Sequence, residues 1–325
     1  MLDNVLIHIG YHKTGTTWLQ NEIFTSKSDC FIPISKYTEG ASTLARDFIY
    51  NREGYLINSF DNNGQVILES LNQITDNVPD LSSKFSVISH ERLSGNPHSS
   101  GFDSSVIARR IKNVFPNAKI LIVIREQCSW ILSNYFQYLS IGGNHSIKKY
   151  LNTKYDGKRP GFSPSHLEYH FLIKDYQLKF GKENVLVLPY ELFDSDKAAF
   201  FQRLGKFIDR DIQLPQKSIF SKRHNTKTNH YSNYKFRFLN TFIHSSSVNN
   251  YSSVKNRISK RLAISIMKQL SRLFSRKFDQ RIQDDLKKQI VIWSNERFVA
   301  SNIITQNLTN LKLSEFNYKT TTNKT

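Results

Sequence analysis

The chain has 325 residues, of which 39% are hydrophobic and 13% aromatic, enough for one large α/β domain or two smaller ones. Two cysteines, Cys30 and Cys128, are too few for a disulfide framework or a cysteine-based zinc site, and they fit a reducing compartment. The apolar runs fall short of the ~20 residues of a membrane-spanning helix, and 45 Lys and Arg against 27 Asp and Glu give a net charge of +18, which indicates anionic partners.

The first apolar stretch, residues 5–9, is too short for the core of a signal peptide and lacks a small-residue cleavage site. It is instead typical of a first β-strand, and it leaves no room before it for a membrane anchor. We therefore expect a cytoplasmic protein.

Short β-branched runs at residues 5–9, 85–89, 119–124 and 184–189 alternate with helical patterns. This alternation predicts an α/β fold with three layers, in which helices cover both faces of a central, mostly parallel sheet. Residues 119–124 are apolar on both faces, as a central strand should be. We expect residues 25–84 to hold helices and an acceptor-facing surface, and residues 154–164, which have loop chemistry, to form a lid or substrate loop.

The first predicted strand ends in a loop bounded by Gly10 and Gly15 and followed by a hydroxyl-rich helix start. Loop amides and a helix N-terminus together suit a phosphate group. The P-loop of nucleotide triphosphatases has a lysine directly after its second glycine. Here Thr16 holds that position and the lysine, Lys13, lies inside the loop, so the pattern argues against a magnesium-ATP hydrolase.

Residues 13–19, Lys-Thr-Gly-Thr-Thr-Trp-Leu, resemble the 5′-phosphosulfate loop of sulfotransferases that use 3′-phosphoadenosine 5′-phosphosulfate (PAPS). The resemblance implies a P-loop-like fold in which Lys13 contacts the phosphosulfate and stabilises charge on the bridging oxygen. The implied phosphate cradle consists of Thr14, Gly15, Thr16 and Thr17. His12 either touches the phosphosulfate or faces solvent, and Trp18 lies either near the nucleotide or, as we favour, in the core.

A second motif of the same family follows the central strand, with Arg125 at the strand end and Ser133 eight residues later. A guanidinium and a hydroxyl suit the 3′-phosphate that distinguishes PAPS from ATP. Gln127 replaces the proline of animal cytosolic members, and the surrounding sequence looks more like bacterial members. Further along, the resemblance places Arg223 and Asn225 where the family often returns a basic loop to the 3′-phosphate.

The strand at residues 85–89 is followed by His90 and Glu91, which are two candidates for the general base. The resemblance to a bacterial Ser-x-Glu form makes Glu91 the first choice and His90 the alternate. Side chains alternate along a strand, so both face the cofactor only if the chain has already turned. A structural pairing of Glu91 with Arg92 or Arg125 is the competing interpretation.

Two more histidines, His166 and His170, are spaced i, i+4 on a predicted helix but lack the acidic residue of a zinc-protease motif. We interpret them as solvent-facing or capping residues and expect no metal. Residues 184–192 resemble the strand and turn before the last helix of the family's core, and residues 200–208 that helix.

The positive charge is concentrated in the C-terminal third. Residues 216–325 hold 21 Lys and Arg and 5 Asp and Glu, a net charge of +16, whereas residues 1–215 hold 24 and 22, a net charge of +2. Within this region a predicted helix has an apolar stripe at Ile258, Leu262, Ile266, Leu270 and Leu273, with Arg257, Lys260, Arg261, Lys268 and Arg272 opposite. Such a helix either packs on the core or docks on anionic lipid or an acidic polymer.

We therefore predict a PAPS-binding sulfotransferase core at residues 1–215 and a basic, mainly helical C-terminal region at 216–325. The leading function is transfer of a sulfuryl group from PAPS to a hydroxyl or amine, on a carbohydrate or glycolipid, with peripheral contact to an anionic membrane or polymer as an option. A P-loop kinase is the alternative. A nucleic-acid-binding module is disfavoured because no recognition motif accompanies the charge, so no nucleic acid is expected as a partner.

Overall fold

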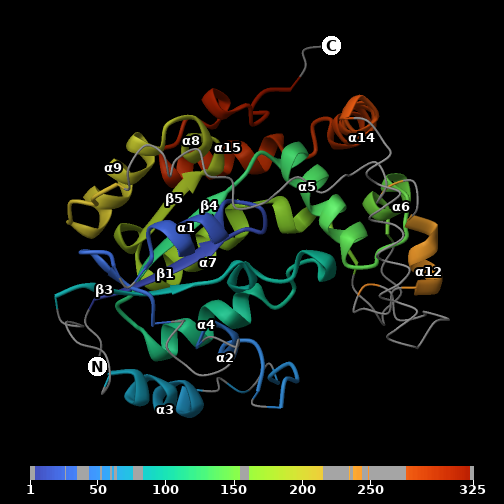
Figure 1. Ribbon diagram of the computed structural model, residues 1–325. Coiled ribbons are helices and arrows are strands. Elements are labelled where there is room, and N and C mark those ends of the chain that lie inside the picture. Colours follow the sequence, from blue (N-terminus) through green and yellow to red (C-terminus); the bar gives the residue numbers. More distant parts are fainter. Residues whose placement is uncertain are drawn as a thin grey trace.

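The sheet at the centre of the protein has five parallel strands. Figure 1 shows it between the helices that flank it. The structure is a computed structural model that describes residues 4–25, 27–34, 44–51, 53–58, 61, 64–75, 83–153, 161–214, 234, 237–243, 248 and 276–322. The strands are β1 (Val5–Gly10), β2 (Phe31–Ile32), β3 (Phe85–Ser89), β4 (Lys119–Ile124) and β5 (Val185–Pro189), in the spatial order β2-β3-β1-β4-β5. The predicted α/β fold with a central parallel sheet is confirmed.

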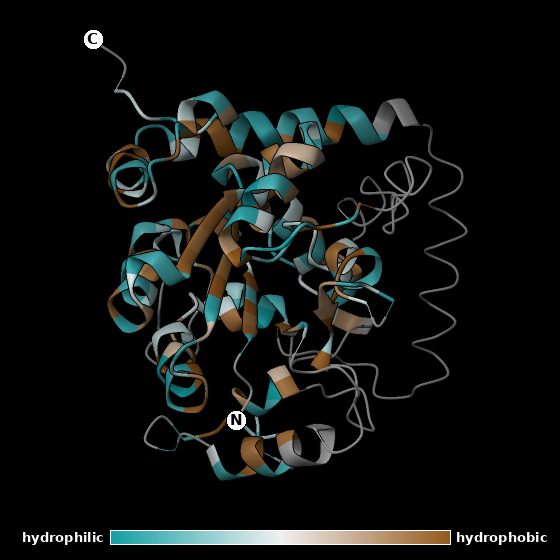
Figure 2. Cartoon of the chain, turned by 90° about the vertical axis from the view of Figure 1, so that its left-hand side faces the viewer, coloured by the Kyte–Doolittle hydropathy of each residue, from teal (hydrophilic) through white to brown (hydrophobic). Residues whose placement is uncertain are grey.

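The two faces of the sheet are covered by different helices, because successive side chains of a strand point to opposite sides. Ile7 and Ile9 pack with α4 (Ser104–Val114), α5 (Gln127–Ser140) and α7 (His170–Phe180). Leu6 packs with α1 (Thr16–Glu22), α8 (Tyr190–Ser195) and α9 (Lys197–Ile208). Burial on both faces explains why the strands are nearly continuous apolar runs, which Figure 2 shows in brown.

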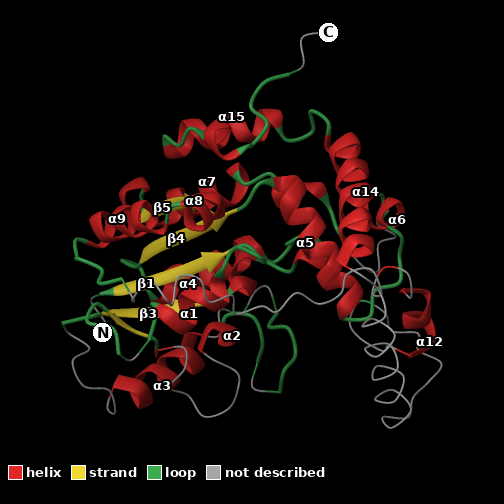
Figure 3. Ribbon diagram, turned by 45° about the horizontal axis from the view of Figure 1, so that its top comes forward, coloured by secondary structure: helices red, strands yellow, loops and turns green. Residues whose placement is uncertain are grey.

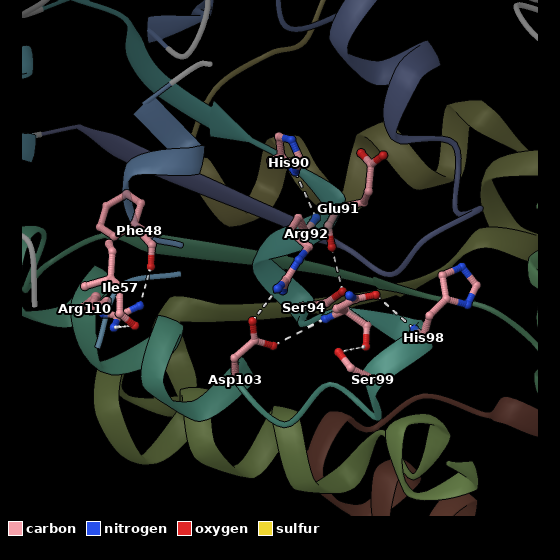
Figure 4. A network of polar contacts seen from close by, with 11 residues as sticks. Phe48, Ile57, His90, Glu91, Arg92, Ser94, His98, Ser99, Asp103 and Arg110 are labelled. Atoms are coloured by element: carbon pink, nitrogen blue, oxygen red, sulfur yellow. Dashed lines mark hydrogen bonds and ion pairs between the residues drawn. The ribbon is translucent and has the colours of Figure 1, made fainter. Parts of the chain in front are cut away.

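The region between β1 and β3 contains α2 (Leu44–Asp47) and α3 (Gly64–Thr75), so the helices expected within residues 25–84 are present. This region is tied to α4 by Arg110, which is buried. Its guanidinium donates hydrogen bonds to the carbonyl oxygens of Phe48 (2.8 Å), Ile57 (3.2 Å), Asn58 (2.7 Å) and Asp61 (2.9 Å). Figure 4 shows part of this arrangement.

We expect Arg110→Met to lower the free energy of unfolding by about 3 kcal/mol, because it removes four hydrogen bonds of a charged, buried donor, one of them to the buried Phe48 carbonyl. Denaturant unfolding followed by circular dichroism measures this change. The control is Arg109→Met on the exposed side of the same helix, which should cost less than about 1 kcal/mol. Equal losses in the two variants would contradict an anchoring role for Arg110.

The C-terminal helices α14 (Arg276–Ser294) and α15 (Val299–Thr309) pack on the core beside α5 and α7, as Figure 3 shows. Leu286 and Ile290 of α14 belong to the same apolar cluster as Ile131 of α5. The helical C-terminal region is thus confirmed. The boundary at 215/216 stays a prediction, and the predicted basic helix at 257–273 lies outside the described residues.

Other described elements are short. They are α6 (Ile147–Leu151), α12 (Asn240–Ile243) and the 3-10 helices η2 (Glu91–Ser94), η3 (Pro97–Ser99), η4 (Pro164–Leu167), η5 (Lys182–Asn184), η6 (Arg237–Leu239) and η7 (Leu313–Phe316). Of the expected lid loop at 154–164, only residues 161–164 are described. Within the described ranges, none of the helices combines the length and the apolar composition that a membrane crossing requires.

Candidate active site

The carboxyl ends of β1, β3, β4 and β5 meet at one edge of the sheet, and the predicted site residues follow these ends. Lys13 lies after β1, Glu91 after β3 and Arg125 after β4. Ligands of parallel α/β sheets bind at this edge, next to the point where the strand order reverses on either side of β1. Parallel topology therefore brings together motifs that are far apart in the sequence.

The loop between β1 and α1 has the backbone of an anion-binding nest. Lys13 and Gly15 both adopt left-handed conformations, with φ of +67° and +83°, and Gly15 is the N-cap of α1. Alternating left- and right-handed residues direct successive amide groups toward one point. Only glycine adopts this conformation without cost, so Lys13 is held there at an expense of about 1 kcal/mol. Strain of this kind is typical of functional loops.

The two buried hydroxyl groups of the loop, those of Thr14 and Thr16, differ in their contacts. Thr14 Oγ1 donates to the Tyr11 carbonyl at 2.5 Å, which fixes the turn. Thr16 Oγ1 and His12 Nδ1 are buried and have no hydrogen-bond partner among the described residues. Buried polar atoms are normally paired, so these two atoms indicate a missing ligand or water. Gly10 leaves space for the Thr16 hydroxyl, because a Cβ at residue 10 would lie 2.5 Å from Thr16 Oγ1.

Lys13 is half-buried, and its surroundings affect its protonation. Burial lowers the pKa of the Lys13 ammonium, the Glu91 carboxylate raises it, and Arg125 lowers it, with a net decrease. Arg125 also contacts Lys13 directly, since its Nη1 donates to the Lys13 carbonyl, and Glu91 is close enough to influence the Lys13 charge. The loop cation, the acid after β3 and the arginine after β4 thus share one site.

Arg125 is fixed by three contacts. Its Nη1 donates to the Lys13 carbonyl at 2.8 Å, its guanidinium carbon lies 4.7 Å from the ring centre of Tyr190, and its carbonyl accepts from the Tyr169 hydroxyl at 2.5 Å. Arg125 Nε is buried without a partner among the described residues. The guanidinium is therefore oriented by the protein and still has a donor for a ligand.

The remaining residues of the two motifs lie in α1 and α5. Thr17 is exposed in the first turn of α1, whereas Trp18 is 7% exposed and packs edge-on against Phe193 in the core. Trp18 therefore lies in the core, which is the position that we favoured for it. Ser133 is half-buried in the middle of α5. Arg223 and Asn225 lie outside the described residues.

The chain turns directly after β3, so His90 and Glu91 are no longer on a strand. His90 caps η2, and its Nδ1 accepts a hydrogen bond from the Arg92 amide at 3.0 Å. Arg92 forms its ion pair with Asp103, with 2.5 Å between Nη2 and Oδ2, and Figure 4 shows Glu91 pointing away from this pair. Burial lowers the pKa of His90, and the neighbouring Glu91 opposes that shift.

Sequence reasoning missed a group of histidines beside the loop. His12, His98 and His166 influence one another electrostatically, and burial lowers the pKa of His98 to about 4 and that of His166 to about 3. The interpretation of His166 as a solvent-facing or capping residue of a helix shared with His170 is wrong. His166 lies in η4, is 6% exposed and packs on Tyr11 and Trp130, because Pro164 starts a separate turn before α7.

Tyr190 and Glu191 are two further site residues that the sequence analysis did not single out. They follow β5 directly and lie beside Arg125, with Tyr190 under the guanidinium. Their position after a predicted strand was the signal that could have identified them. Among the described residues, no group of His, Cys, Asp and Glu is arranged to hold a metal ion.

The fold and the site define an α/β protein of P-loop-like architecture with a glycine-bounded loop after its first strand. The family profile described as "Sulfotransferase domain" matches residues 2–289. The chain belongs to this sulfotransferase family, and its activity class is sulfotransferase. A search of curated proteins found no match.

Three solved structures to which this chain is similar are sulfotransferases or contain a sulfotransferase domain. A sulfotransferase from Alicyclobacillus acidocaldarius has 16% identity and a TM-score of 0.48, over 76% of this chain and 98% of that one. A sulfotransferase domain from the curacin biosynthetic pathway has 13% identity and a TM-score of 0.36, over 87% and 97%. Mouse sulfotransferase SULT7A1 complexed with PAP has 12% identity and a TM-score of 0.36, over 94% and 88%.

Proposed function

We propose that the protein transfers a sulfuryl group from PAPS to a hydroxyl or amine of an acceptor, by in-line displacement with Glu91 as general base. The observation that carries this proposal is the nest at Lys13 and Gly15, beside Arg125 and Glu91, with a buried Thr16 hydroxyl that has no partner within the described part of the chain. Together these groups suit PAPS, which has a 5′-phosphosulfate at one end and a 3′-phosphate at the other. The absence of a lysine after Gly15 argues against a kinase.

The residues present fit this donor. Loop amides, Thr14, Thr16 and Thr17 would hold its 5′-phosphosulfate, and Arg125 with Ser133 would hold its 3′-phosphate. When bound, PAPS supplies an activated sulfuryl group on a phosphate leaving group. Lys13 would hold positive charge next to the oxygen that becomes negative as the bond to sulfur breaks. Contacts of His12, Arg223 and Asn225 with the donor stay predictions.

Hydrogen bonding of His90 supports Glu91 as the base. His90 Nδ1 accepts the Arg92 amide, so the proton of the neutral ring is on Nε2, and neither nitrogen has a free lone pair. A carboxylate keeps acceptor capacity after one contact. Glu91 lies near Lys13, on the side of η2 away from the Arg92 pair, where it can take the acceptor proton.

The acceptor that we propose is a carbohydrate or glycolipid made in a bacterial cytoplasm. Support comes from Glu91, because the sequence at the end of β3 resembles the bacterial Ser-x-Glu form, and a glutamate is the base in many family members that act on carbohydrates. The net charge of +16 at residues 216–325 supports contact with an anionic membrane or polymer at the inner face of the membrane.

Isothermal titration calorimetry with adenosine 3′,5′-bisphosphate and with magnesium-ATP tests this function. We expect the bisphosphate to bind more tightly and without magnesium, because Arg125 would contact its 3′-phosphate. Magnesium-dependent preference for ATP would instead favour the kinase. Transfer of labelled sulfate from PAPS onto a cell-envelope extract, compared with a nucleic-acid extract, tests the acceptor class.

Affinity for the bisphosphate should decrease as the pH rises, and this decrease should begin at a pH below about 10.4, the ordinary pKa of a lysine. Lys13 attracts the anion only while protonated, and burial lowers its pKa, so its charge is lost at a lower pH than usual. Dissociation constants measured between pH 7 and pH 10 should show this decrease. The Lys13→Met variant should bind the bisphosphate weakly at every pH and should not show the pH-dependent decrease in affinity. A decrease of equal size in this variant would exclude Lys13 as the cause of the pH dependence.

A further inference from the structure

We infer that Tyr318, acting through Glu191, is a positioning residue for Arg125 and thereby for the 3′-phosphate of the donor nucleotide. This inference rests on the proposed function, since it requires that Arg125 bind the 3′-phosphate. Tyr318 lies beyond residue 289, where the family match ends. The selectivity of the nucleotide site would then depend on a part of the chain that the family profile does not match.

Glu191 joins Tyr318 to the peptide that follows Arg125. Glu191 Oε1 accepts a hydrogen bond from the Glu126 amide at 2.9 Å, and Glu191 Oε2 accepts one from the Tyr318 hydroxyl at 3.1 Å. Burial raises the pKa of Glu191, and these hydrogen bonds and Arg125 oppose the increase. A mostly buried carboxylate with fixed donors on both oxygens is rigid, so the Arg125–Glu126 peptide that it holds is rigid as well.

The opposite side of the same peptide is held too. The Tyr169 hydroxyl donates to the Arg125 carbonyl at 2.5 Å, and the Glu126 carboxylate caps α5 by accepting from the amides of Cys128 and Ser129, both at 2.8 Å. Among these contacts of the peptide and its neighbours, the one with Tyr318 comes from the C-terminal region. Through Glu191 it gives that region a route to Arg125.

Tyr318 is itself held in place through Asn302, a residue of α15 that is 1% exposed. Asn302 Nδ2 donates to the Lys319 carbonyl at 2.9 Å, and Asn302 Oδ1 accepts from Gln127 Nε2 at 2.6 Å. Gln127 is the first residue of α5, two positions after Arg125. Two routes thus join the segments around Tyr318 and Arg125, one through Asn302 and one through Glu191. They fix the Tyr318 ring, which is 2% exposed, against Glu191.

Pre-organisation of Arg125 matters because a bidentate contact with phosphate requires a fixed orientation of the guanidinium plane. Glu191 and Tyr169 hold the backbone at Arg125. The Lys13 carbonyl and the Tyr190 ring hold its guanidinium group. Loosening the peptide should weaken binding of the 3′-phosphate. Contacts with the 5′-phosphate should change less, because the loop after β1 would make them and Arg125 meets that loop at the Lys13 carbonyl.

The test is Tyr318→Phe, with affinities measured by calorimetry for adenosine 3′,5′-bisphosphate and for adenosine 5′-monophosphate. We expect the dissociation constant of the bisphosphate to rise about fivefold, the equivalent of one hydrogen bond, and that of the monophosphate to change less than about twofold. The matched control is Tyr176→Phe. Tyr176 is equally buried, and its hydroxyl has no hydrogen-bond partner among the described residues, so both constants should stay within about twofold.

A double variant separates positioning from general stability. In an Arg125→Ala background, Tyr318→Phe should cause no further loss of bisphosphate affinity, because the group that Tyr318 positions is absent. Thermal unfolding confirms that each variant is folded at the temperature of the titration. Equal weakening of both nucleotides by Tyr318→Phe, or no weakening of either, would overturn the inference. Equal affinity of the unsubstituted chain for both nucleotides would instead overturn the proposed function, and the inference with it.

Discussion

Lys13→Ala should lower the rate of sulfuryl transfer at saturating PAPS by about 10²- to 10³-fold, the usual effect of removing one group that stabilises developing charge. Lys13 lies inside the nest and near both Arg125 and Glu91. Alanine also has a Cβ, so the substitution does not relieve the strain of the left-handed backbone at this position. The loss should therefore report the ammonium group and not the shape of the loop.

Incorporation of labelled sulfate into a cell-envelope extract measures this rate. The matched control is Lys84→Ala, since Lys84 is also half-buried but lies before β3, at the opposite edge of the sheet, where its Nζ donates to the Ser28 carbonyl. Its rate should stay within about threefold of that of the unsubstituted chain. A Lys13→Ala enzyme with normal transfer would remove Lys13 from the proposed mechanism.

Glu91→Gln should lower the transfer rate by about 10²- to 10⁴-fold, as expected when a general base is removed. Glutamine keeps the size of the side chain but cannot accept the acceptor proton at neutral pH. Because the proposed role of Glu91 concerns the acceptor, the dissociation constant of adenosine 3′,5′-bisphosphate should change less than about threefold. Initial rates and calorimetry on the same preparation separate these two quantities.

His90→Asn provides the comparison. An asparagine oxygen can still accept the Arg92 amide, as His90 Nδ1 does, so the cap of η2 is retained. The rate should decrease less than about tenfold if His90 only positions the turn. A larger loss in His90→Asn than in Glu91→Gln would make His90 the base, and losses below tenfold in both would place the base elsewhere.

Predictions from the sequence succeeded where the pattern is local. The strands at 85–89 and 119–124 have the predicted bounds, and β1 and β5 differ from prediction by one residue. Long apolar runs between helical segments leave few alternatives to buried parallel strands. Prediction failed for His166, because a spacing of four residues does not reveal that Pro164 starts a separate turn.

What the sequence by itself determined is the α/β fold, the glycine-bounded loop and the membership of the chain in a sulfotransferase family, since strand periodicity and a contiguous motif are local properties. Only the tertiary structure decided the surroundings of Arg125 and the protonated nitrogen of His90. Glu191 and Tyr318 are 127 residues apart, and His12 meets His98 and His166 from separate elements. Contacts at such separations depend on how the helices pack, and neither composition nor periodicity specifies that packing.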